Sequence, residues 1–150
     1  MQKPQPGGLA AGRLERRLGR YKDNRLMPKK TRGELEAEFT KAMVKFEKDY
    51  LGRGPLEART YFLQDLVLVR LRGILTPAED KLAENRDGQV LVKETRRQLF
   101  EISRPLIEAM VTDILGCQLV SLHTDMSTRT GERVVVLTVD SDLDQRLRAG

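Results

Sequence analysis

The sequence predicts an α+β fold: a four-stranded, mostly antiparallel sheet with helices on one face, in the order α-β-β-α-α-β-β. Three observations indicate this fold. Apolar residues recur every three or four positions in two separate segments, which is typical of helices that bury one side. Apolar and polar residues alternate in two later pairs of short segments, which is typical of half-buried hairpins. Glycine and proline punctuate the chain between these segments.

The first predicted helix begins at Thr31, because Thr31 and Glu34 have the spacing of a capping box. Gly52 is expected to end this helix, and Gly54-Pro55 to form an irregular turn, since proline disfavours α geometry in the residue before it. The apolar stripe of the helix is expected to pack in the core, and it consists of Leu35, Phe39, Met43, Phe46 and Tyr50.

Two strands at 58–64 and 66–73 are expected to follow, joined by a turn at Gln64-Asp65. Side chains of a strand point alternately to opposite faces of the sheet. The residues expected to point into the core are Thr60, Phe62, Val67, Val69 and Leu71. Those expected to point away from it are Arg59, Tyr61, Arg70 and Arg72.

The second half starts with another capping box, Thr76-Pro77-Ala78-Glu79, which predicts a short helix ending near Asn85. Asp87-Gly88 should separate it from a long amphipathic segment at 89–115, which Pro105 should kink or split and Gly116 should cap. The buried stripe of this segment is expected to be Leu91, Leu99, Ile102, Leu106, Met110 and Ile114.

Strands at 117–127 and 132–140 complete the predicted sheet, with Thr128–Gly131 as their connection. Because helices are expected on one face only, the other face should stay uncovered. Mixed polar and apolar faces of this kind commonly meet a ligand or another subunit. The candidate interaction surface on this face comprises Arg59, Tyr61, Arg70, Arg72, Ser121, His123 and Asp125.

Charge divides the chain of 150 residues into unequal parts. Residues 1–33 contain ten lysines and arginines but two acidic residues, so the net charge of +5 comes from this end. We therefore expect a basic, flexible extension at 1–30, an α+β domain at 31–143 and a frayed C-terminus at 144–150. The extension at 1–33 could bind nucleic acid or anionic lipid.

Catalytic chemistry has little support in the sequence. Ser121, His123 and Asp125 are spaced two apart on a strand, so neighbouring groups lie about 6.5–7 Å apart, too far for most direct hydrogen bonds. A polar strand face, with His123 hydrogen-bonded to Asp125 or to a partner, is the favoured interpretation. With one cysteine and one histidine, the chain also lacks the usual ligand set of a zinc site. We expect no enzymatic activity, no cofactor and no metal.

Two turns could contact a small anion or a nucleotide. Gly52–Pro55 could present backbone N–H groups beside Arg53, and Thr128–Gly131 could present hydroxyl groups beside Arg129. The glycines in both turns are also explained by backbone geometry alone, and that structural interpretation is favoured.

Several short motifs occur in an order that resembles one family. They are Leu51–Pro55, Arg59–Tyr61, Val67–Leu71, Gly73–Glu79, Arg104–Leu106, Ser121–Asp125 and Ser127–Arg133. The family, long regarded as a domain of unknown function, is now called MpsC, after a Na+-translocating membrane potential-generating system. The resemblance covers roughly residues 31–143 and implies a soluble accessory or regulatory protein associated with Na+-linked or inorganic-carbon transport. It implies no catalytic residues.

Protein partners are therefore expected first: a membrane transporter subunit, or a second copy bound through the open sheet face. The chain has no apolar run near the roughly 20 residues that cross a bilayer, and its single cysteine cannot form an internal disulfide. We expect a cytoplasmic protein that is at most peripheral to a membrane. Nucleic-acid or lipid binding through the basic extension, and anion sensing at the two turns, are the alternatives.

Overall fold

The first half of the domain follows the predicted helix–hairpin order. The structure, a computed structural model, describes residues 29–148, so all but the last two residues of the predicted extension at 1–30 lie outside it. Thr31 caps the first helix, since its hydroxyl oxygen accepts a hydrogen bond of 3.2 Å from the backbone N–H of Glu34. The elements are helix α2 (Arg32–Phe46), π-helical turn η1 (Glu47–Leu51), strand β1 (Glu57–Leu63) and strand β2 (Leu66–Arg72).

The second half repeats this helix–hairpin order, and two additional helices precede it in the chain. Both long helical segments end in a π-helical turn followed by glycine, Gly52 in the first half and Gly116 in the second. The elements are α3 (Pro77–Leu82), α4 (Arg86–Ile102), α5 (Arg104–Met110), η2 (Val111–Leu115), β3 (Leu119–Ser127), β4 (Glu132–Val139) and α6 (Leu143–Arg148).

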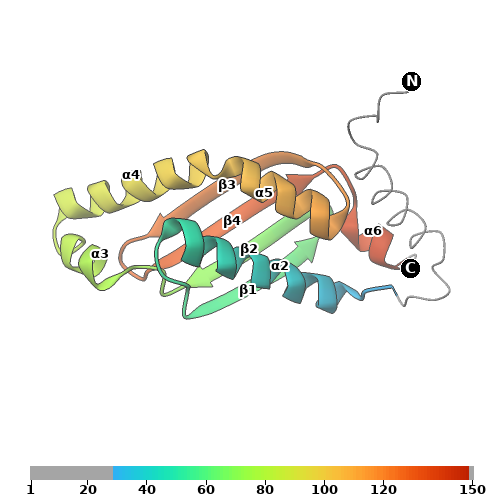
Figure 1. The fold of residues 1–150 in the computed structure, drawn as a ribbon, viewed down its shortest axis with the longest axis horizontal. Helices are drawn as coiled ribbons and strands as arrows, with labels where there is room; N and C mark the ends of the chain where they lie inside the picture. Colours follow the sequence, from blue (N-terminus) through green and yellow to red (C-terminus); the bar gives the residue numbers. More distant parts are fainter. Residues whose placement is uncertain (1–28, 149–150) are drawn as a thin grey trace, which may run out of the picture. The chain divides into compact units, whose positions relative to one another are not determined.

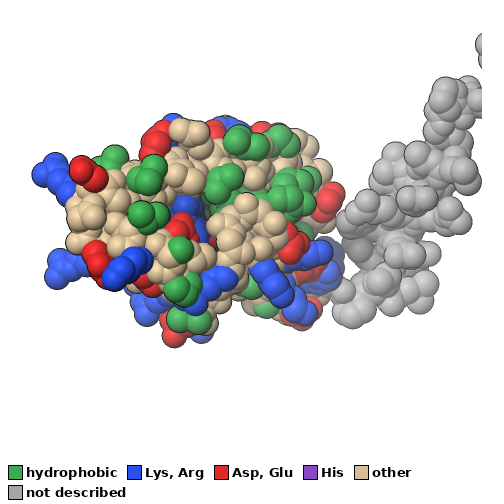
Figure 2. All heavy atoms as spheres, turned by 60° about the vertical axis from the view of Figure 1, so that its left-hand side comes forward, with side chains coloured by type: hydrophobic (Ala, Val, Ile, Leu, Met, Phe, Trp, Pro, Cys, Tyr) green, Lys and Arg blue, Asp and Glu red, His purple; other side chains and the backbone are tan. Residues whose placement is uncertain are grey.

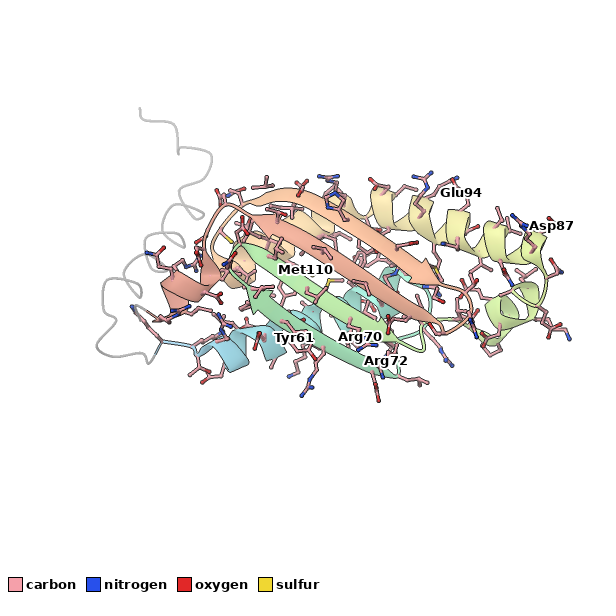
Figure 3. The ribbon with its side chains drawn as sticks, turned by 180° about the vertical axis from the view of Figure 1, so that it is seen from behind. Tyr61, Arg70, Arg72, Asp87, Glu94 and Met110 are labelled. Carbon is pink, nitrogen blue, oxygen red and sulfur yellow. The ribbon has the colours of Figure 1, made fainter. Side chains whose placement is uncertain are left out.

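The four strands form one antiparallel sheet in the order β1-β2-β4-β3. Helices α2, α4 and α5 lie over one face of it (Figure 1). Seen from behind, the other face carries none of the helices that residues 29–148 form (Figure 3). The predicted fold class and the one-sided cover are thus confirmed. The two central strands, β2 and β4, come from different halves, so their pairing joins the two helix–hairpin units into one sheet.

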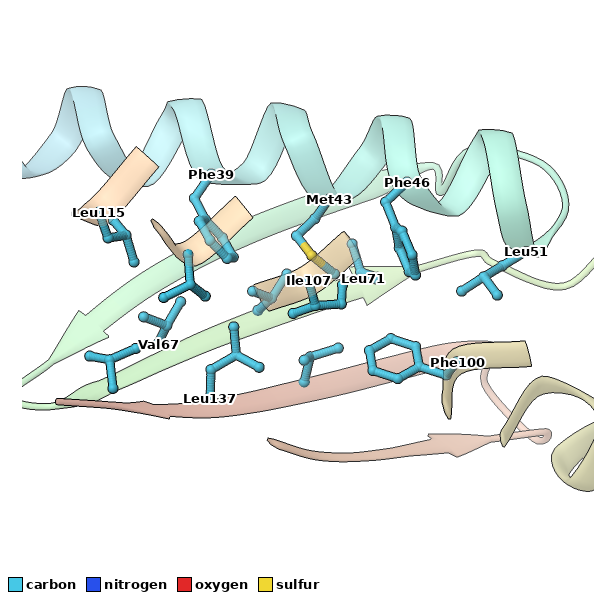
Figure 4. Packing of buried hydrophobic residues seen from close by; sticks show 14 of the residues in the cluster. Phe39, Met43, Phe46, Leu51, Val67, Leu71, Phe100, Ile107, Leu115 and Leu137 are labelled. Atoms are coloured by element: carbon cyan, nitrogen blue, oxygen red, sulfur yellow. The ribbon is translucent and has the colours of Figure 1, made fainter. Parts of the chain in front are cut away.

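The core lies between this sheet and its helices. Phe39 and Met43 from α2 meet Ile107 from α5 over the inward residues of β2 and β4, as Figure 4 shows. The inward set expected for the first hairpin is confirmed, since Thr60, Phe62, Val67, Val69 and Leu71 are all buried. The expected turn is also confirmed, and Gln64 adopts a positive φ of 57° in it.

The predicted stripe of the long helical segment is confirmed for Leu99, Met110 and Ile114, which pack against the core, but was wrong for its other three residues. Leu91 and Ile102 are 55% and 75% exposed, and Leu106 is 38% exposed. The buried residues are instead Val92, Arg96, Phe100, Ile107, Val111 and Leu115. An arginine occupies a core position of α4, so the apolar period is interrupted where the helix is most buried. Pro105 splits the segment as expected, because α4 ends at Ile102 and α5 restarts at Arg104.

Two boundaries also differ from expectation. Asp87-Gly88 does not separate two helices but lies in the first turn of α4, where the Asn85 side chain accepts a hydrogen bond from the N–H of Gly88. The C-terminal residues, expected to fray, form α6 as far as Arg148, with Leu143 buried. Asp144 of this helix pairs with Arg32, which holds α6 to the start of α2.

Candidate functional site

The uncovered side of the sheet is a regular grid of side chains, called the open face below. Strand pairing aligns its residues in four rows, each crossing the sheet from β1 through β2 and β4 to β3. The first two rows are Leu63, Leu66, Thr138, Ser121 and Tyr61, Leu68, Val136, His123. The last two are Arg59, Arg70, Val134, Asp125 and Glu57, Arg72, Glu132, Ser127, and in the last row an ion pair joins Arg72 to Glu132.

The open face changes in character from one end to the other. Its first two rows are largely apolar, and Tyr61 and Leu63 are 42% and 60% exposed there. Its last two rows hold three arginines and three carboxylates, so this ionic end has no net charge. Tyr61, Arg70 and Arg72 project from the uncovered side in Figure 3. The open face therefore has an apolar end beside an ionic end that lacks the excess positive charge a polyanion selects.

Ion pairs hold part of the ionic end together. Glu132 accepts a hydrogen bond of 2.7 Å from Nε of Arg70 and lies 3.6 Å from Nε of Arg72, whose Nη1 is also 3.5 Å from Glu57. Arg59 differs, because it lies 6.0 Å over the ring of Tyr61 and, within residues 29–148, has no carboxylate partner. One positive charge of the open face is therefore available to another molecule.

The structure places all seven predicted surface residues on the open face. His123 is exposed, and no hydrogen bond joins it to Asp125 within the described part of the chain. The carboxylate of Asp125 instead accepts a hydrogen bond from the N–H of Met126, and Lys93 lies 3.4 Å away. The Met126 N–H and Lys93 together lower the pKa of Asp125 despite some burial. Ser121, His123 and Asp125 are thus neighbours on one strand face without a connected proton path.

The two predicted anion turns lie close to each other, on either side of Gly73. Arg53 donates a hydrogen bond of 3.2 Å to the carbonyl oxygen of Gly73, and Ile74 N–H donates one of 3.1 Å to the carbonyl oxygen of Gly131. The Arg53 guanidinium therefore already has a backbone partner. Arg129 is exposed in the second turn. Anion contact at these two arginines stays a prediction.

A buried ionic cluster lies under the helices, and sequence reasoning missed it. Glu47, Arg96 and Arg133 are at most 1% exposed, and they come from η1, α4 and β4. Nε of Arg133 is 3.1 Å from Glu47, and Nη1 of Arg96 is 3.5 Å from it. Arg96 also donates to Glu79 at 2.6 and 2.7 Å and to the Ile74 carbonyl oxygen at 2.9 Å.

The neighbours of the cluster fit these two arginines. Gly52, with φ 144°, lies against Arg96, and a Cβ there would be 3.3 Å from its Nη2. The Arg133 guanidinium lies 4.9 Å from the centre of the Phe100 ring and donates to the hydroxyl of Thr124. Because each charge is matched by partners from other elements, the cluster joins helices to sheet and is best explained as structural.

Burial and pairing shift the two carboxylates in opposite directions. Burial raises the pKa of Glu47, although Arg133 and Arg96 oppose it. Burial also acts to raise the pKa of Glu79, but hydrogen bonds from Arg96 and Thr76 outweigh this effect and lower the pKa below 4.5. Of these two carboxylates, Glu79 is therefore the one whose contribution to folding stability weakens in acid.

This difference leads to a pH prediction. A carboxylate with a lowered folded-state pKa contributes stability that is complete above its unfolded pKa and is lost as pH falls through the folded value. The difference in unfolding free energy between wild type and Glu79→Gln should be constant above about pH 5 and should decrease as the pH falls below 4.5. Urea titrations at several pH values measure it. A gap that stays constant throughout the acid range would contradict the assigned pairing.

Fold and surface together define a small α+β protein with a one-sided helical cover and an uncovered, half-apolar sheet face. Seen from the end where α3 lies, charges of both signs are interspersed with hydrophobic side chains, so this view shows no extended basic patch (Figure 2). The chain belongs to the MpsC family, whose model, described as the Na+-translocating membrane potential-generating system, matches residues 31–141.

Two relatives from Bacillus subtilis (strain 168) match nearly their whole length. The uncharacterized protein YbcI is 41% identical over 119 residues, which is 79% of this chain and 96% of YbcI. The uncharacterized protein YrhF is 27% identical over 114 residues, which is 75% of this chain and 93% of YrhF. No solved structure matches the chain. Within residues 29–148, none of the helices is long and apolar enough to cross a membrane.

Proposed function

We propose that this chain is a non-enzymatic accessory subunit of a Na+-linked membrane potential-generating system and acts by binding protein through its open face. The observation that carries the proposal is the composition of that face: two largely apolar rows beside two charged rows with no net charge. A surface of this kind gains free energy from apolar burial and specificity from paired charges.

The composition favours protein over the other ligand classes considered. Nucleic acid and anionic lipid select surfaces with excess positive charge, because their affinity comes largely from neutralising phosphates. On the open face Arg70 and Arg72 are already paired with Glu132. The basic extension could supply such an excess, and residues 1–28 of it lie outside the described structure.

An accessory role also agrees with the chemistry of the polar residues. A nucleophile needs a base within hydrogen-bond reach, and Ser121, His123 and Asp125 form no such link in the described structure. The buried ionic cluster around Glu47 lies in the core, where Glu47 pairs with Arg96 and Arg133, and these ion pairs explain its presence without a catalytic role. The family description supports the connection with Na+ and membrane potential.

A pair of tyrosine variants tests the proposal in the native host. Tyr61→Glu places a charge in the apolar half of the open face, whereas Tyr50→Glu places one on η1, where the tyrosine is 54% exposed. In a strain lacking the chain we expect the Na+-dependent part of the membrane potential to fall. Wild type and Tyr50→Glu should restore it, and Tyr61→Glu should not.

The readout is a potential-sensitive dye measured with and without Na+, alongside immunoblots showing equal protein levels. If deleting the chain leaves the Na+-dependent potential unchanged, the connection with such a system is wrong. If Tyr61→Glu restores the potential as well as wild type does, the open face is not the surface that carries this function.

A further inference from the structure

The open face is complementary to itself, and this identifies what covers it. Resting on the proposal that this face binds protein, we infer that its occupant is a second copy of the chain. The two sheets pack face to face around a two-fold axis parallel to the strands. The partners of the membrane system would then meet a dimer rather than a single chain.

A two-fold axis along the strands preserves the rows of the grid and reverses their order across the sheet. Residues of β1 then face β3 of the second copy, and residues of β2 face β4. Arg59 meets Asp125 of the partner subunit, and Arg72 meets Glu132 of the partner subunit. In the apolar half, Leu68 meets Val136 of the partner subunit. Each contact occurs twice, as an isologous interface requires.

The alternative axis, perpendicular to the strands, gives a poor match. It would reverse the rows and place the apolar row on the charged one. Leu63 would then face Glu57 of the partner subunit, and Leu66 would face Arg72 of the partner subunit. Charges buried against apolar groups lose hydration without gaining a partner. The distribution of residues along the strands therefore selects the parallel axis.

At the edges of the sheet, this arrangement joins an arginine without an opposite charge in the described chain to an exposed carboxylate that Lys93 contacts at 3.4 Å. Arg59 has no carboxylate partner within residues 29–148, and the side chain of Asp125 is 82% exposed. They lie in the same row at opposite edges of the sheet. Packed sheets are rotated by about 30°, which displaces corner residues most, and the long arginine side chain can span that displacement.

The size of the face sets the expected strength of the dimer. Four strands about 4.8 Å apart, with eight residues at about 3.4 Å each, cover roughly 500 Å² in projection. Stable interfaces bury about 800 Å² on each partner, so this face is at the small end of that class. We expect a reversible dimer with a dissociation constant in the micromolar range, on the order of 1–100 μM.

A charge exchange tests both the occupant and the axis. Arg59→Asp and Asp125→Arg should each weaken self-association of the full-length chain at least about tenfold, because each places like charges opposite each other. Mixing the two variants should restore dimerisation. In the mixed dimer the two introduced side chains face each other at one edge with opposite charges, and the two unchanged side chains form the original pair at the other edge. Lys81→Asp, on exposed α3, is the control and should dimerise like wild type.

Sedimentation equilibrium from about 1 to 200 μM measures the association, a span chosen around the expected dissociation constant. Restoration by mixing excludes misfolding as the cause of the weakening. A wild-type chain that is monomeric throughout, or single variants that dimerise normally, would overturn the inference. The membrane-potential experiment tests the proposed function separately. If the chain is monomeric but Tyr61→Glu still fails to restore the membrane potential, the open face binds a different protein.

Discussion

Arg96→Met is expected to lower the free energy of unfolding by about 3–5 kcal/mol, the usual cost of removing one partner from a buried ion pair. Methionine has a length similar to that of arginine but cannot donate to Glu79, Glu47 or the Ile74 carbonyl oxygen. Glu47 would then keep only Arg133 as its buried counter-charge. An unbalanced carboxylate in the core is costly because no water replaces the lost partner.

Urea unfolding followed by circular dichroism measures this loss, and the next residue supplies the control. Arg97 pairs with Glu94 on the exposed side of the same helix, so Arg97→Met should leave the midpoint unchanged within error. The two variants make the same chemical change one position apart. Equal midpoints for both would show that the buried cluster contributes no more than a surface pair does.

Gly88→Ala is expected to destabilise the domain by at least about 2 kcal/mol, because the added methyl group has no space. A Cβ on Gly88 would lie 1.6 Å from the carbonyl oxygen of Leu82, the last residue of α3. That atom belongs to the backbone, so relief requires α3 to move away from the first turn of α4. Such a movement would also strain the Asn85 cap, which now accepts the Gly88 N–H at 2.8 Å.

Gly33→Ala is the matched substitution, since Gly33 also lies in the first turn of a helix but has no atom within 4 Å of its added Cβ. Alanine there should stabilise the domain by about 0.5 kcal/mol, because it reduces the conformational freedom of the unfolded chain. Opposite signs for the two variants are the expected thermal and urea result. If Gly88→Ala and Gly33→Ala both destabilised the domain, the cause would be alanine in the first turn of a helix rather than the contact of Gly88 with α3.

Local patterns were sufficient to predict most of the fold. Capping at Thr31 and Thr76, the split at Pro105 and the turn at Gln64-Asp65 depend on a few adjacent residues, and the structure confirms them. Alternation along the strands likewise placed the seven surface residues on the uncovered side. These features could be predicted because backbone sterics, capping and side-chain alternation act within a few residues of sequence.

The buried face of α4 could not be predicted in the same way. Arg96 looks like a surface residue in a helix, and Leu91 and Ile102 look like core residues, yet the structure reverses these roles. The available signal was weak. Val92, Arg96 and Phe100 are spaced four residues apart, but they form a buried stripe only if the charged Arg96 is counted as a core residue. Its acceptance depends on two glutamates that are 17 and 49 residues away in the sequence.

The sequence alone determined the helix–hairpin units, the faces of their strands and the family to which they belong. The tertiary structure alone decided which charges could be buried, and that Arg59 and Asp125 end one row at opposite edges of the sheet. The reason is physical: backbone conformation follows from neighbours along the chain, whereas the free energy of a charge depends on the groups that surround it in space. Those groups come from elements far apart in the sequence and meet only in the folded domain.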